Sequence, residues 1–85
     1  MDRHLILGVH VTERLKHAQA IQEVLTNFGD TIKTRIGLHD VNGEISSPNG
    51  VLLLECIDKQ DRFSSLKQDL SNIEGVEIKE IVFDH

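Results

Sequence analysis

The sequence predicts one small α+β domain whose elements follow the order β-α-β-β-α-β. The chain has 85 residues, enough for one hydrophobic core and too few for two. In its predicted strands, apolar residues either occupy every second position or follow one another without a break. In its predicted helices, apolar residues recur at three- and four-residue steps. Two β-α-β crossovers in so short a chain predict a four-stranded antiparallel sheet in the order 4-1-3-2. With both helices on one face, this is a ferredoxin-like sandwich.

The first predicted strand covers residues 4–11, whose odd-numbered positions are apolar and share one face. A helix is predicted from about residue 13 to 28 by one apolar stripe, formed by Leu15, Ala18, Ile21, Val24, Leu25 and Phe28. Thr12 stands where a hydroxyl can cap the first turn. Gly29 suits the left-handed position that ends many helices.

The second predicted strand covers residues 31–39, and its successive side chains are expected on alternate faces of the sheet. Lys33, Arg35, Gly37 and His39 are expected on the face away from the helices, with Lys33 and Arg35 near Glu55 of the next strand. Residues 40–50 carry Asn-Gly and Ser-Pro-Asn-Gly signals and predict a long hairpin loop.

Residues 51–57 form a nearly continuous apolar run, typical of a central strand covered on both faces. A second helix follows, which Asp58 or Asp61 can cap and Gly75 can end, with a buried stripe of Phe63, Leu66, Leu70 and Ile73. Residues 76–83 are the last strand. The positions of its apolar residues change from one face of the strand to the other near Glu80, which a bulge or a change of burial would explain.

The third strand is apolar on both faces, although both helices are predicted on one. A second copy of the chain is the simplest cover for the other face, so the sequence predicts a dimer or tetramer through the sheet. Ile6, Val51, Leu53 and Ile57 would form the apolar patch. Lys33, Arg35 and Glu55 would form a polar rim around it.

Composition excludes several function classes. The formal net charge of −5 argues against non-specific nucleic-acid binding and against docking on an anionic membrane. No apolar run is long enough for a membrane span, and no secretory signal pattern opens the sequence. A single cysteine fits a reducing cytoplasm. The sequence also carries no helix-turn-helix, so no direct DNA binding is expected.

No catalytic site is predicted. Cys56 should point towards the helices as a small buried hydrophobe, not as an exposed thiolate. His10 and His39 would lie about 10 Å apart with the third strand between them, too far to share one metal ion within a chain. We therefore predict no metal and no cofactor, while a site built across an oligomer interface stays open.

Candidate ligand-binding residues at such an interface are Arg35, Gly37, His39 and His10. A guanidinium such as that of Arg35 can bind an anion or a partner carboxylate, and a strand ion pair is the alternative. A glycine in mid-strand, such as Gly37, marks either close approach by a ligand or second chain, or a bulge.

Residues 27–38, together with 50–54 and 73–79, resemble a family of small stand-alone proteins named as regulators of the iron-only hydrogenase system. Its most specific pieces here are Asp30-x-Ile32-x-x-Arg35-x-Gly37 and Gly75-Val76. The resemblance covers roughly residues 3–83. It implies an ACT-like fold, close to the C-terminal domain of nickel-responsive repressors, and a single domain over residues 1–85.

The resemblance also implies a regulatory or sensing role. The nickel site of the repressors needs a His-x-His pair, which this sequence lacks. The ACT ligand loop needs a glycine after the first strand, whereas Gly8 lies inside it. We therefore expect a non-enzymatic, oligomeric regulatory module that binds a small ligand or a protein partner. The alternative is a structural or accessory subunit of a hydrogenase-linked complex that binds no ligand.

Overall fold

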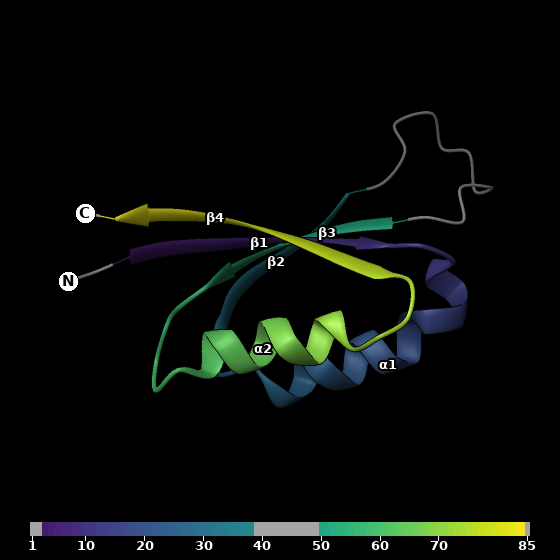
Figure 1. Cartoon of the computed structure of the whole chain (residues 1–85), viewed down its shortest axis with the longest axis horizontal. Helices are drawn as coiled ribbons and strands as arrows, with labels where there is room; N and C mark the ends of the chain where they lie inside the picture. The colour runs from purple at the N-terminus through teal and green to yellow at the C-terminus, as the bar shows by residue number, and fades with distance from the viewer. Residues whose placement is uncertain (1–2, 39–49, 85) are drawn as a thin grey trace.

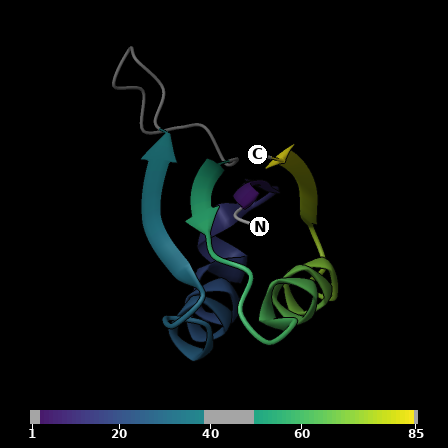
Figure 2. The same cartoon turned by 90° about the vertical axis from the view of Figure 1, so that its left-hand side faces the viewer.

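The computed structural model describes residues 3–38 and 50–84, which form one sheet and two helices. The elements in chain order are β1 (Arg3–Val11), α1 (Arg14–Asn27), β2 (Ile32–Leu38), β3 (Gly50–Cys56), α2 (Arg62–Ser71) and β4 (Val76–Asp84). The sheet is antiparallel in the order β2-β3-β1-β4. Both helices lie side by side on one face of it (Figure 1) (Figure 2). The predicted fold class and strand order are confirmed. The predicted loop over residues 40–50 falls largely outside the described residues.

The core lies between the sheet and the two helices. Its buried apolar side chains are Leu5, Leu7, Val9 and Val11 of β1, Leu54 and Cys56 of β3, Ile21 and Leu25 of α1, Phe28, and Phe63, Leu66 and Leu70 of α2. Alternation puts the odd-numbered residues of β1 on the helix side, as predicted. No helix among residues 3–38 and 50–84 is long and apolar enough to cross a membrane.

The ends of α1 differ from the prediction. Glu13, not Thr12, occupies the N-cap, in a left-handed conformation with φ of 53°. The backbone amide of Thr12 instead donates to the carbonyl of Gly75 at 2.8 Å, which joins the start of α1 to the loop before β4. Gly29 directly follows the C-cap residue Phe28, but it is not left-handed. Among the described glycines, Gly75 has a positive φ, at 83°.

The start of α2 also lacks the predicted side-chain cap. Asp61 stands at the N-cap in a left-handed conformation and makes no capping hydrogen bond with its side chain. Asp58 pairs with Arg3 of β1 instead, with Oδ2 and Nη2 2.8 Å apart. The connection after β3 is therefore held to the N-terminal end of β1.

A β-bulge in β2 reverses the orientation predicted for most of that strand. Ile32 pairs with Cys56 and Thr34 with Glu55, so β2 advances two residues while β3 advances one. From Thr34 onward the two faces are exchanged relative to a regular strand. Arg35 and Gly37 consequently lie on the helix side, and the prediction that they face away from the helices was wrong.

Strand β4 contains no such irregularity in its pairing with β1. Its register runs without a break from Val76 to Asp84. Glu80 lies on the helix side, where Lys67 of α2 pairs with it at 3.0 Å. A change of burial, and not a bulge, therefore explains the shift in alternation near Glu80.

Candidate functional site

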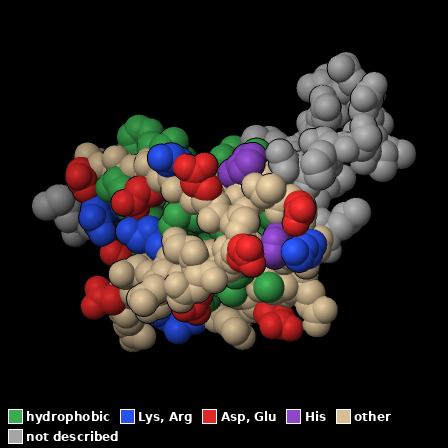
Figure 3. Space-filling model, turned by 45° about the vertical axis from the view of Figure 1, so that its right-hand side comes forward, with side chains coloured by type: hydrophobic (Ala, Val, Ile, Leu, Met, Phe, Trp, Pro, Cys, Tyr) green, Lys and Arg blue, Asp and Glu red, His purple; other side chains and the backbone are tan. Residues whose placement is uncertain are grey.

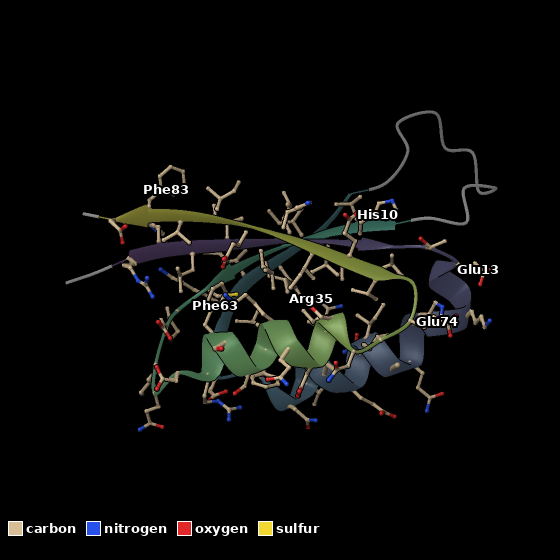
Figure 4. All side chains as sticks on the ribbon, viewed as in Figure 1. His10, Glu13, Arg35, Phe63, Glu74 and Phe83 are labelled. Carbon is tan, nitrogen blue, oxygen red and sulfur yellow. The ribbon has the colours of Figure 1, made fainter. Side chains whose placement is uncertain are left out.

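The first candidate surface is the sheet face away from the helices, called the open face below. Its residues are His4, Ile6, Gly8 and His10 of β1, Thr34 and Ile36 of β2, Val51, Leu53 and Glu55 of β3, and Glu77, Lys79, Ile81 and Phe83 of β4. Figure 4 shows Phe83 and His10 on this side of the sheet. In Figure 3, hydrophobic side chains reach the surface along the upper, sheet side, with charged side chains and a histidine between them.

Large apolar side chains of the open face are about half exposed. The exposed fractions are 52% for Ile36, 51% for Ile81 and 54% for Phe83. Ile6 and Leu53, partly buried, lie between them across the sheet, because Ile6 pairs with Ile81 and Leu53 with Ile36. The apolar residues therefore form a diagonal from the C-terminal end of β4 to the middle of β2. The predicted placement of Ile6 and Leu53 on one face is confirmed.

Glu55 is the acidic centre of the open face, but its neighbours are not those predicted. Its carboxylate accepts a hydrogen bond from Thr34 Oγ1 at 3.0 Å and lies 3.4 Å from His4 Nε2. The expected contact with Arg35 is absent, because the bulge turns that side chain to the helix side. On β4, Lys79 Nζ lies 3.8 Å from a carboxylate oxygen of Glu77.

The second candidate surface is a cleft of about 180 Å³ between α1 and strands β2 and β3, called the α1 cleft below. Its apolar floor comes from Val11, Ile21, Leu25 and Leu52. Gln22 and Arg35 supply its polar side chains, with Arg35 Nη2 donating to Gln22 Oε1 at 3.3 Å. Figure 4 shows Arg35 in the space between the sheet and the helices.

The structure brings together only some of the predicted ligand-binding residues. Arg35 and Gly37 both line the α1 cleft. His10 lies on the opposite face of the sheet, and His39 lies outside the described residues. Ala18 and Gln22, one helical turn apart, line the cleft as well and were not predicted. An alanine and a glutamine on a helix carry no sequence signal that separates them from ordinary surface residues.

Cys56 is buried on the helix side, as predicted. Burial, with a smaller contribution from the charge of Glu55, raises the pKa of its thiol to about 11. Such a thiol is protonated at neutral pH and is a poor nucleophile. Within residues 3–38 and 50–84, no three His, Cys, Asp or Glu side chains are grouped closely enough to hold a metal ion.

Several solved structures share this fold. The structure of the uncharacterized protein TM1266 from Thermotoga maritima aligns with a TM-score of 0.81 at 25% identity, over 99% of this chain and 100% of that chain. The ACT domain from GTP pyrophosphokinase of Chlorobium tepidum gives 0.69 at 17% identity, over 95% and 100%. CPII, a nitrogen regulatory PII-like protein from Thiomonas intermedia K12, bound to ADP, AMP and bicarbonate, gives 0.55 at 11% identity, over 98% and 92%. The last two likenesses establish the fold alone.

No curated protein matches the sequence. A family model does match residues 3–80, and it is described as "TM1266-like: Iron-only hydrogenase system regulator, putative". This match spans most of the chain and agrees with the fold and with the resemblance carried by residues 27–38. The chain therefore belongs to the TM1266-like family.

Proposed function

We propose that the chain is a non-catalytic, single-domain regulatory module of the iron-only hydrogenase system, acting in the cytoplasm. It self-associates through the open face and responds to a small ligand or a protein partner. The observation that carries the proposal is the open face itself, where Ile36, Ile81 and Phe83 are about half exposed. The family description supports the regulatory role.

The size of the apolar patch favours a protein partner on the open face. A large aromatic side chain buries about 150–250 Å², so three half-exposed side chains of comparable size present on the order of 300 Å². The largest apolar patch on a typical monomeric protein covers about 300–600 Å² and is often functional. Burial of apolar area contributes about 25 cal/mol per Å², which favours association once the flanking side chains are also covered.

The charges of the open face favour a second copy of the chain as the occupant. Lys79 lies on the same face as Glu55 and Glu77. A partner of one charge sign would oppose either the lysine or the two glutamates with like charge. A second copy presents both signs, and a two-fold arrangement is the commonest way to pair such a surface with itself.

Sedimentation velocity tests self-association. At tens of micromolar the wild-type chain is expected to sediment as a dimer or tetramer. Leu53→Asp should dissociate it, because an unpaired carboxylate would be buried in the interface. Ala20→Asp, on the exposed surface of α1, is the control and should leave the assembly intact. A monomeric wild-type chain overturns self-association and, with it, any interface role of His10.

A ligand-free structural subunit is the alternative, and thermal shift separates it from the proposal. A ligand that binds only the folded state raises the melting temperature by mass action, whereas a purely structural subunit responds to no ligand.

The proposal includes no direct DNA contact, because the net charge is −5. A gel shift at physiological salt should therefore show no sub-micromolar, sequence-dependent complex.

A further inference from the structure

We infer that the α1 cleft binds a small carboxylate with a compact apolar tail, with the carboxylate on Arg35 and the tail over the apolar floor. The inference rests on the proposed function, because it names the ligand class of that regulatory module. It uses a surface that lies on the opposite side of the sheet from the proposed interface. The two proposals can therefore succeed or fail separately.

The polar end of the cleft is suited to a monoanion. A guanidinium has five N–H donors and a full positive charge. Among the described residues, the recorded side-chain partner of Arg35 is the neutral amide of Gln22, at 3.3 Å. That contact leaves most of the donors and all of the charge uncompensated. A carboxylate would supply the missing charge and can accept two parallel hydrogen bonds from the fork.

A carboxylate fits this cleft better than a phosphate ester does. Among the described residues that line the cleft, Arg35 is the one with a cationic side chain. The chain as a whole carries a net charge of −5. A dianion near a single cation on an acidic protein meets unfavourable long-range repulsion, which a monoanion largely avoids.

The apolar end of the cleft limits the size of the tail. Val11, Ile21 and Leu25 are buried core residues whose side chains form its floor, with Leu52 beside them. The volume is about 180 Å³. An apolar cavity of about 150 Å³ accommodates benzene, so a tail of about six carbon atoms fits here.

The small residues around the cleft keep it open. Ala18 on α1 has only a methyl group, and Gly37 and Gly50 on the facing strands have no side chain at all. A larger side chain at position 18 would project over the floor from the helix. Ala18→Leu should therefore fill the space that the tail needs while keeping a residue with high helix propensity.

Nuclear magnetic resonance titration of the ¹⁵N-labelled chain provides the test. The probes are benzoate and 3-methylbutanoate, with benzamide and 3-methylbutanamide as their uncharged counterparts. Both acids should shift the amide resonances of Ala18 and Gly37 saturably. Ligands of this size are expected to bind with a dissociation constant of about 1 mM or tighter. Each amide should bind at least about tenfold more weakly than its acid, because it lacks the charge.

Three variants make the test specific. Arg35→Gln should weaken binding of both acids at least about tenfold, and Ala18→Leu should abolish it. Lys33→Gln is the matched control: it removes a cation from the same strand but outside the cleft, and affinity should stay within about twofold. The resonance spectrum of each variant checks that it is folded.

Several results would overturn the inference. These are equal affinity for acid and amide, unchanged affinity in Arg35→Gln, or no shift at the cleft at about ten times the expected dissociation constant. Any of them leaves the sedimentation of the wild-type chain unaffected. A monomeric wild-type chain, by contrast, overturns the proposed self-association whatever the cleft binds.

Discussion

Arg62, at the start of α2, pairs with Asp30 in the turn that follows α1, with Nε and Oδ2 3.0 Å apart. The same guanidinium donates through Nη2 to the carbonyl of Asn27 at 2.8 Å and lies 4.7 Å from the ring centroid of Phe28. The last carbonyls of a helix have no partner within it. The side chain of Arg62 therefore donates to the carbonyl of the last residue of α1 and attaches α2 to that helix.

Arg62→Ala is expected to lower the free energy of unfolding by about 1–2 kcal/mol. The ion pair itself contributes little, because its side chains are 36% and 60% exposed. Most of the loss should come from the hydrogen bond to Asn27 and from stacking on Phe28. Arg62→Lys should recover less than half, because an ammonium cannot reproduce the planar fork. Urea denaturation measures the loss.

The control for this prediction is Lys59→Ala. Lys59 is an exposed cation nearby, and its side chain has no recorded partner among the described residues. Its removal should change stability by less than about 0.5 kcal/mol. If Arg62→Ala costs no more than Lys59→Ala, the attachment of α2 to α1 through Arg62 is energetically unimportant.

The overall architecture could be predicted because several independent sequence patterns indicate the same fold. The apolar odd-numbered positions of residues 4–11 and the two helical stripes define which side chains are buried. The crossovers then restrict the strand order to very few alternatives. The burial of Leu7, Leu54 and Phe63 on the helix side agrees with these patterns.

The orientation of Arg35 could not be predicted by the same reasoning. A bulge exchanges the two faces of a strand, but the apolar residues Ile32 and Ile36 both keep even-numbered positions. The sequence of β2 therefore shows no shift in alternation that would reveal the extra residue at Lys33. The bulge appears only in the pairing, where Ile32 opposes Cys56 and Thr34 opposes Glu55. The α1 cleft was missed for this reason, since it exists only when Arg35 and Gly37 face the helix.

Leu54→Ala should destabilise the chain by about 2–5 kcal/mol, because a fully buried leucine leaves a cavity when truncated. The adjacent Leu53 is the matched control, since it lies on the open face and is only partly buried. At a protein concentration low enough to keep the chain monomeric, Leu53→Ala should cost less. Equal losses in the two variants, measured by urea denaturation, would contradict the assignment of these leucines to opposite faces.

Gly75→Ala should be destabilising because of both conformation and space. Gly75 has φ of 83°, a left-handed conformation that costs an L-residue about 1–2 kcal/mol. An added Cβ would lie 3.0 Å from His17 Nε2 and 3.2 Å from the carbonyl oxygen of Thr12. We expect a loss of about 1–3 kcal/mol, measured by thermal and urea denaturation.

Gly29→Ala is the control for that glycine. Its φ lies outside the left-handed region, and its added Cβ would make only an ordinary contact, 3.5 Å from the carbonyl oxygen of Thr26. Stability should change by less than about 1 kcal/mol, with a small gain from reduced unfolded-state entropy. A loss as large as that of Gly75→Ala would mean that backbone conformation does not explain the effect at Gly75.

The Cys56 thiol should make stability depend on pH in the alkaline range. Its pKa rises from 9.0 to about 11 on folding, mainly through burial and secondarily through the charge of Glu55. An acid whose pKa is raised in the folded state stabilises that state fully below the unfolded pKa. The stabilisation is lost as pH rises through the folded pKa, so the free energy of unfolding should fall between about pH 9 and 11. A shift of this size corresponds to a loss of about 2–3 kcal/mol at most.

Cys56→Ala isolates this contribution, because the variant keeps every other ionisable group of the chain. The variant will be less stable at neutral pH because it leaves a small cavity. Its stability should nevertheless fall less steeply than that of the wild type from pH 8 to pH 11, and the difference in slope is the quantity to measure. Parallel urea denaturation series at pH 8, 9, 10 and 11 determine it. Identical slopes would show that Cys56 keeps an ordinary pKa, which a thiol packed between β3 and the helices should not have.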